Sequence, residues 1–332
     1  MKAPDLTARQ IQILEELAVY QHATADLLLR RLRLSPNSLR YLQKQIYALY
    51  DPDKPEDRYV DFLYPPKHNP SRFGGSAPYV VTLGPKGFAF LRKRGVDIGR
   101  YRNSTSWVHE PFPLRHRLAV NEFLLKAQLL ETEQTPEVQD TQVTLLKFLH
   151  EKYWNANPLK VQPSDAEKSQ GLSPDLLLAF ATQQPRELYW MLPEINLSEP
   201  WRKDWEAKVR LYRYCMPAYQ ERLGTRLLTT IPVMIASSSA FPRQVYAKET
   251  GEDRIERRRE AQRRFRRMQT LLKWTENVLN RLNMRAEADL FSFSYAPHDV
   301  LSPTELFFSP IWIHPFSDTY HALLRSGKEG NS

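Results

Sequence analysis

Cysteine is nearly absent from this 332-residue chain, which holds Cys215 and no other thiol. A single cysteine excludes intramolecular disulfides and cysteine-rich zinc sites, and it fits a reducing compartment such as the cytoplasm. No apolar run approaches the roughly 18 residues that a membrane span needs, so we expect no membrane partner. The residues after Lys2 form no apolar core, so we expect no signal peptide.

Glycine is also scarce, with 11 residues in the whole chain. Neither a G-x-x-x-x-G-K-[ST] loop nor a G-x-G-x-x-G turn occurs, which argues against a nucleotide-hydrolysing motor and a dinucleotide-binding enzyme. The eight histidines are scattered without H-x-H or H-x-x-x-H spacing. The sequence therefore lacks the common signatures of nucleotide and zinc chemistry.

Positive charge is abundant, with 47 Lys and Arg against 38 Asp and Glu. Residues 1–100 carry a net charge of +6, and eight arginines fall within residues 254–267. Basic charge favours polyanionic partners, above all nucleic acid.

The first hundred residues predict a winged helix-turn-helix domain. Apolar spacing indicates helices over 6–20, 23–34 and 35–50, the third of which begins with Ser35 as N-cap and Pro36 at its first position. Strands over 59–66 and 77–83 follow, and then a short helix over 84–95. Three helices followed by a β-hairpin is the order of a winged helix.

In a winged helix the third helix enters the major groove and the hairpin contacts the DNA backbone. The candidates for reading base edges are Asn37, Ser38, Arg40, Tyr41, Gln43 and Lys44. The candidates for contacting phosphates are Arg31, Arg33 and Lys44, with Lys67 and Arg72 in the wing. The expected partner is double-stranded DNA, and a homodimer is a further expectation. The alternative is that this module binds proteins and that its polar face is only solvated.

Residues 101–113 are predicted to be a linker, and residues 114–325 a second domain that mixes helices and strands. We expect a helix over 114–131, strands near 140–150, 172–180 and 186–195, and a helix over 199–222. A strand over 226–237, a basic helix over 253–285 and strands near 289–295 and 305–314 complete the domain. The predicted fold class is α+β.

Two acidic residues stand at the ends of neighbouring predicted strands. Asp175 follows Pro174 at the start of one strand, and Glu194 ends the next. Hairpin geometry can bring these ends together, which would make a two-carboxylate site for a hard cation such as Mg²⁺. Such a metal can activate water for cleavage of nucleic acid. The alternative is that both acids merely end their strands.

This pattern resembles the PD-(D/E)XK nuclease core, in which a helix before the strands often adds an acid. Glu122 is the candidate for that acid. Asn196 stands where the resemblance implies a lysine, and Lys203 or Lys208 on the following helix is the candidate replacement. Without such a lysine the resemblance implies a fold that binds DNA but does not cut it.

The chain as a whole resembles the bacterial replication-relaxation family of plasmids and other mobile elements. The similar segments are LTARQIQILEELA, YVVTLGPKGFAFL, HRLAVNEF, SPDLLLAF, LYWMLPEINLSE and KVRLYRY. The resemblance implies a winged helix joined to a nuclease-like domain, with a role in plasmid replication or DNA topology. The family's acidic strand is usually Glu-x-Asp followed by Gly-Thr, and Asn196-Leu197-Ser198 departs from that pattern.

The predicted basic helix over 253–285 is a second candidate DNA-binding surface. Its apolar stripe consists of Phe265, Met268, Leu272, Leu279 and Leu282. The arginines expected to contact phosphates are Arg257, Arg258, Arg263, Arg264 and Arg267. A membrane surface and a merely solvated face are the alternatives.

Three hypotheses follow for the function. The first is a DNA-binding protein of a plasmid or mobile element that acts in replication, maintenance or transfer, with replication or transfer proteins as partners. The second is a metal-dependent endonuclease that uses Asp175 and Glu194. The third is a catalytically inactive nuclease fold that serves as a scaffold.

Overall fold

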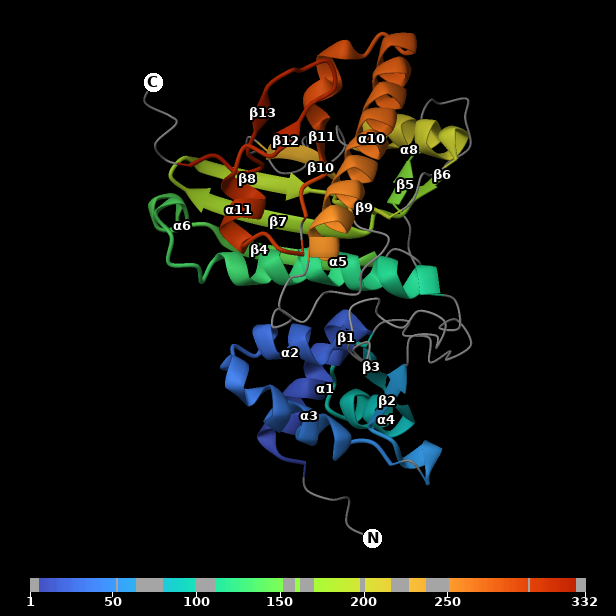
Figure 1. Ribbon diagram of the computed structural model, residues 1–332, viewed down its shortest axis with the longest axis vertical. Coiled ribbons are helices and arrows are strands. Elements are labelled where there is room, and N and C mark those ends of the chain that lie inside the picture. The colour runs from blue at the N-terminus through green and yellow to red at the C-terminus, as the bar shows by residue number, and fades with distance from the viewer. Residues whose placement is uncertain are drawn as a thin grey trace. The chain divides into compact units, whose positions relative to one another are not determined.

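The computed structural model describes residues 6–51, 53–63, 80–98, 111–151, 159–161, 170–197, 201–215, 227–236, 251–297 and 299–326. It divides into two compact units (Figure 1), of which unit 1 holds the described residues up to Asn121 and unit 2 those from Glu122 onward. The chain is of the α+β class, with a small antiparallel sheet in unit 1 and a larger mixed sheet in unit 2. No helix in these ranges is both long and apolar enough to cross a membrane.

The helices of unit 1 begin where polar side chains cap them. Helix α1 (Ala8–Tyr20) starts after Thr7, which forms a reciprocal capping box with Gln10. Helix α2 (Ala25–Arg31) is capped by the hydroxyl of Thr24. Helix α3 (Leu39–Tyr47) follows the 3₁₀ turn η1 (Pro36–Ser38), so the expected third helix begins with a tighter turn. The expected order of three helices is confirmed.

Three short strands form the sheet of unit 1. They are β1 (Ala23–Thr24), β2 (Val60–Leu63) and β3 (Val80–Leu83), in the antiparallel order β1-β3-β2. The 3₁₀ turn η2 (Pro55–Asp57) precedes β2, and α4 (Pro85–Lys93) follows β3. Gly87 of α4 lies so close to the Tyr59 carbonyl that an added Cβ would sit 2.2 Å from its oxygen, so a side chain there would displace α4.

Helix α5 (Pro111–Leu130) begins three residues earlier than predicted, within the expected linker. Its first half belongs to unit 1, where Leu114 and Leu118 pack with Leu63 and Val80. The buried amide of Asn121 donates hydrogen bonds to the carbonyls of Tyr20 and His22, at 2.9 and 2.7 Å. These bonds fix α5 on the turn between α1 and α2.

Unit 2 is built on a sheet of eight strands in the order β13-β12-β11-β10-β8-β7-β4, with β9 paired to β10 (Figure 1). The strands are β4 (Thr144–His150), β7 (Leu176–Gln183), β8 (Arg186–Met191), β9 (Glu194–Asn196), β10 (Leu227–Ile235), β11 (Phe291–Ser294), β12 (Trp312–Ile313) and β13 (Tyr320–His321). Strand β10 runs parallel to β8, β9 and β11, while β4, β7 and β8 are antiparallel neighbours. A separate pair joins β5 (Leu159–Val161) to β6 (Gln170–Leu172).

Helices cover both faces of this sheet. Helices α8 (Arg202–Cys215) and α10 (Gly251–Arg281) share one apolar core with alternate residues of β10, namely Ile231, Val233 and Ile235. On the other face, Phe307 packs edge-on against Phe123 of α5 and Phe180 of β7. Short helices α6 (Pro136–Thr141) and α11 (Pro303–Phe308) and the 3₁₀ turn η4 (Arg285–Leu290) complete the unit.

One predicted strand was wrong in part. Helix α11 (Pro303–Phe308) overlaps the start of the strand expected near 305–314, and only Trp312–Ile313 are extended. The physical reason is a capping box between Ser302 and Glu305, with Pro303 at the first helical position. These helix-start residues were visible in the sequence, and they outweigh the apolar run that favoured a strand.

Candidate functional site

The antiparallel pairing of β7 and β8 brings Asp175 and Glu194 together. Leu178 pairs with Met191, and the same register continued past the ends of β7 and β8 sets Asp175 opposite Glu194, the first residue of β9. The Oδ2 atom of Asp175 accepts a 2.7 Å hydrogen bond from the backbone N–H of Ile195. Both acids are buried, so the expected meeting of the two strand ends occurs inside the unit.

Two side chains from α8 converge on Glu194. The Nζ atom of Lys208 lies 2.5 Å from one carboxylate oxygen, and the hydroxyl of Tyr212 donates to the other. Residues four apart on a helix lie on the same face, which is why both reach one carboxylate. Of the two lysines proposed as replacements, Lys208 therefore reaches the site. Lys203 is exposed, about 140° around α8 from Lys208.

Burial dominates the electrostatics of this cluster. It raises the pKa of Glu194 to about 7, against the opposing effect of Lys208 and with a further increase from the charge of Asp175. Burial by itself would lower the pKa of Lys208, but the carboxylates of Glu194, Asp175 and Glu151 together raise it. Lys208 is therefore a cation at neutral pH, held among three acids.

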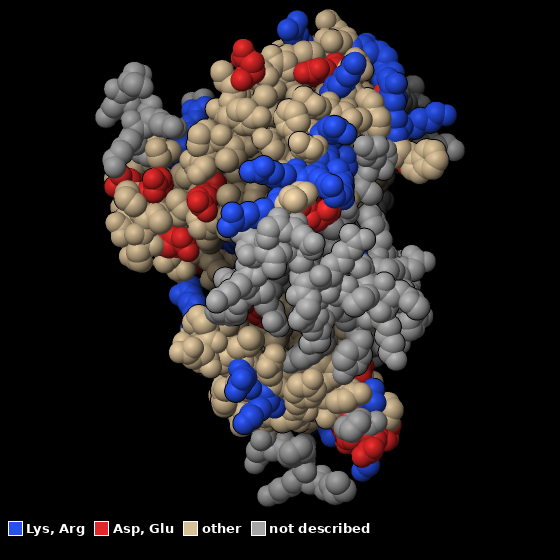
Figure 2. Space-filling view, viewed as in Figure 1, with Lys and Arg blue, Asp and Glu red and all other residues tan. Residues whose placement is uncertain are grey.

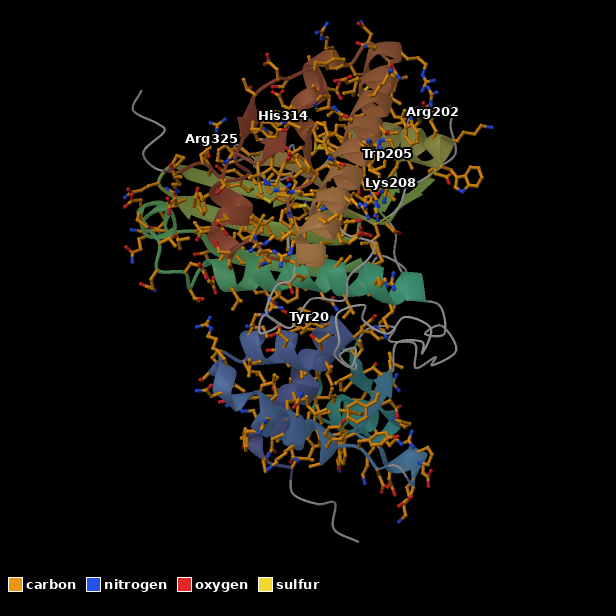
Figure 3. The ribbon with its side chains drawn as sticks, viewed as in Figure 1. Tyr20, Arg202, Trp205, Lys208, His314 and Arg325 are labelled. Atoms are coloured by element: carbon orange, nitrogen blue, oxygen red, sulfur yellow. The ribbon has the colours of Figure 1, made fainter. Side chains whose placement is uncertain are left out.

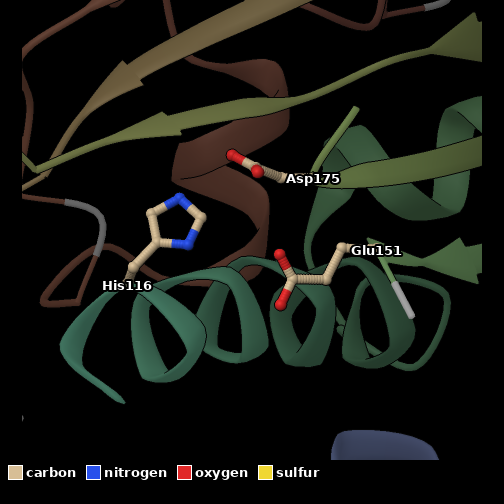
Figure 4. Close-up of side chains that lie close together, drawn as sticks. All are labelled: His116, Glu151 and Asp175. Atoms are coloured by element: carbon tan, nitrogen blue, oxygen red, sulfur yellow. The ribbon is translucent and has the colours of Figure 1, made fainter. Parts of the chain in front are cut away.

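Glu151 is the third acid of the cluster, and it directly follows strand β4. Figure 4 draws Glu151 and Asp175, which both belong to unit 2. A carboxylate oxygen of one lies within 4.8 Å of a carboxylate oxygen of the other. Two carboxylate donors at this spacing fit a divalent cation.

Glu122, the acid expected to come from the preceding helix, is placed elsewhere. Its carboxylate pairs with Lys126 at 3.5 Å, and Lys126 also donates to the carbonyl of Leu301. Asn196 is the last residue of β9, at the position where the resemblance implied a lysine, and its buried Oδ1 atom has no hydrogen-bond partner.

The third helix of unit 1 presents a continuous polar face. Asn37, Arg40, Tyr41 and Lys44 are exposed, Tyr41 by 53%, while Leu42 and Ile46 are buried. Among the other residues predicted for this face, Ser38 and Gln43 are partly buried, and Arg33 is exposed. Arg31 pairs with Glu16 at 3.1 Å. Lys67 and Arg72 lie outside the described residues.

The basic half of α10 separates into exposed and buried arginines. Figure 2 shows Lys and Arg gathered over the part of unit 2 where α10 lies, and Arg257, Arg258 and Arg263 are exposed there. Arg264 and Arg267 are buried, which removes both from the predicted DNA-contacting set. Arg267 donates to the carbonyls of Leu197 and Ala236, which follow the ends of β9 and β10. Its guanidinium therefore serves the packing of α10 on the sheet.

A family model described as replication-relaxation matches residues 6–229. The chain belongs to the replication-relaxation family. Family membership points to a role in replication or in a mobile element, which agrees with the resemblance seen in the sequence. No curated protein and no solved structure matches the chain.

In this family member, sequence reasoning missed Glu151 and Tyr212. An acid directly after the strand predicted over 140–150 was a usable signal for Glu151. The four-residue spacing of Lys208 and Tyr212 was a signal for the pair on α8.

Proposed function

We propose that this protein binds double-stranded DNA of a plasmid or mobile element and acts in its replication, maintenance or transfer. Unit 1 is the site-reading module, which we assign as a winged helix-turn-helix. The order α1-β1-α2-α3-β2-β3 and the antiparallel β1-β3-β2 sheet support this assignment. Family membership supports the biological role.

The observation that carries the proposal is the exposed face of α3. Leu42 and Ile46 anchor the helix in the core, so Asn37, Arg40 and Lys44 project from the opposite side at spacings of three and four. Asn and Arg can pair with adenine and guanine edges in the major groove. Lys44 supplies charge for the backbone.

The exposed arginines of α10 provide the second contact. A cation that neutralises a phosphate releases a counterion, so such contacts strengthen binding without reading sequence. Arg258 is exposed, whereas Arg263 pairs with Glu256 at 3.0 Å and Glu260 at 3.2 Å. We expect Arg258 to contribute more than Arg263.

The test is duplex binding by the full chain, measured by fluorescence anisotropy on a site selected from genomic fragments. Replacing Arg40 and Lys44 together by alanine should weaken binding at least tenfold and, through the loss of the Lys44 phosphate contact, reduce the slope of log K against log salt by about 1. The matched control replaces Arg92 and Lys93, two exposed cations at the end of α4, and should leave both quantities unchanged. Equal losses in the two double variants would refute a specific role of α3.

A metal-dependent nuclease activity is the second candidate, favoured by the meeting of Asp175, Glu194 and Lys208. This arrangement resembles the two acids and one lysine of PD-(D/E)XK enzymes, with the lysine supplied from α8. Asp175 and Glu151 would hold a divalent cation, since Glu194 is already engaged by Lys208 and Tyr212. A bound Mg²⁺ or Mn²⁺ would supply activated water and offset phosphate charge.

Incubation of supercoiled plasmid with the protein and Mg²⁺ or Mn²⁺ tests this candidate. Asp175→Asn should abolish cleavage, while Asp204→Asn, which changes an exposed acid on α8, should not. Absence of nicking by the wild-type protein with both metals would leave the inactive scaffold as the better description of unit 2.

A further inference from the structure

Helix α8 begins with an indole that the fold leaves uncovered. Trp201 is 83% exposed, whereas Trp205, one turn later, is 4% exposed and donates its Nε1–H to Thr275. The carbonyl of Trp201 accepts the backbone N–H groups of Asp204 and Trp205, at 3.0 and 3.1 Å. Trp201 therefore immediately precedes α8, and its backbone carbonyl is held by the first turn of the helix.

Trp201 lies on the side of α8 that carries the candidate site. Figure 3 labels Trp205 and Lys208 along this helix. At 100° per residue, Lys208 is within about 20° of the direction of Trp201 and roughly 10 Å further along the axis. Trp201 therefore precedes Lys208, whose ammonium group contacts Glu194, by about two helical turns on the same side of α8.

The surroundings of Trp201 are charged and not apolar. Two exposed cations, Arg202 and Lys203, follow Trp201 directly in the chain, and Trp201 is the one large exposed hydrophobic side chain among residues 201–212. The core of a protein interface buries several apolar side chains together. A single aromatic ring beside cations matches a polyanion that carries flat, stackable groups.

We propose that Trp201 stacks on an unpaired base, so that unit 2 engages a single strand or a locally opened duplex beside the Glu194–Lys208 pair. Base stacking on an aromatic side chain does not depend on the base identity, because every base has a π-face. The phosphates of the same strand would face Arg202 and Lys203, the exposed cations that follow Trp201 in the chain. This inference rests on the proposed DNA-binding function and names the form of DNA that the second unit binds.

The test compares a fluorescein-labelled single-stranded oligothymidine with a duplex of the same length, both titrated with the full chain. Trp201→Ala should weaken single-strand binding about tenfold, since one stacked base is worth roughly 1–3 kcal/mol. Trp201→Phe should retain most of the affinity, and duplex binding should change less than about twofold. Tyr320→Ala, which removes an exposed aromatic ring from β13, is the matched control and should bind like wild type.

Each outcome supports or overturns the inference. Unchanged single-strand affinity of Trp201→Ala, with normal duplex binding, overturns this inference and leaves the proposed function intact. Failure of the wild-type chain to bind either form overturns both. A third outcome is that Trp201→Ala changes the monomer–dimer equilibrium, measured by light scattering, while its DNA affinity stays unchanged. That result would assign the indole to a contact between copies of the chain and overturn the inference.

Discussion

The buried carboxyl of Glu194 makes the stability of unit 2 depend on pH in a predictable direction. Burial raises its pKa from 4.5 to about 7 in the folded state. The folded protein therefore holds this proton more tightly than the unfolded chain, and stability falls as the pH rises through the window from 4.5 to 7. A difference of about 2.5 pH units corresponds to about 3 kcal/mol. Lys208 stays protonated in both states across this window, so it does not reverse the sign.

Glu194→Gln isolates this effect because glutamine cannot ionise. Between pH 4.5 and pH 8, the free energy of unfolding of the variant should rise by about 3 kcal/mol relative to that of the wild type. The reason is that the wild-type protein must keep an ionised group in a desolvated site at the higher pH. Other titrating groups are shared by the two proteins and cancel in the difference. Glu131→Gln changes an exposed glutamate just after α5 and serves as the control. The difference between its free energy of unfolding and that of the wild type should not vary with pH.

Urea unfolding followed by tryptophan fluorescence measures this difference. All seven tryptophans lie at position 107 or later, and none lies among residues 1–100, so the signal reports mainly on unit 2. A constant offset between Glu194→Gln and wild type from pH 4.5 to 8 would refute the reasoning, because Glu194 would then titrate as it does in the unfolded chain.

Variants at four further positions test other buried polar groups. Asn121→Ala should destabilise unit 1 by about 2 kcal/mol in urea unfolding followed by circular dichroism, because two buried carbonyls lose their donor. His22 has its pKa lowered to about 3 by burial, so folding stability should fall as the pH drops below about 6.5, and His22→Gln should lessen that fall in acid titrations. Arg267→Met should cost about 3 kcal/mol in urea unfolding, with more loss than in a variant of the exposed Arg257. Asp175→Asn should keep the acceptor for a backbone N–H and cost less than about 1 kcal/mol, whereas Asp175→Ala should cost about 2 kcal/mol in thermal or urea unfolding.

Local patterns were sufficient for the features that depend on neighbouring residues. The 3.6-residue repeat and the capping residues Thr7, Thr24 and Ser35 determine the helices of unit 1 and the polar face of α3. A helix fixes which of its side chains share a face, so this surface was predictable before any tertiary contact was known. The two-residue strand β1 was missed because Ala23 and Thr24 are too few to show a period.

Only the tertiary structure decided which charged residues meet. The register of β7 on β8 placed Asp175 opposite Glu194, and the packing of α8 selected Lys208 over Lys203. A run of arginines looks uniform in sequence, yet the position of α10 on the sheet buried Arg267 at two carbonyls and left Arg257 exposed. Contacts between residues far apart in the chain depend on how elements pack and rotate against one another, and a local period carries no information about that rotation.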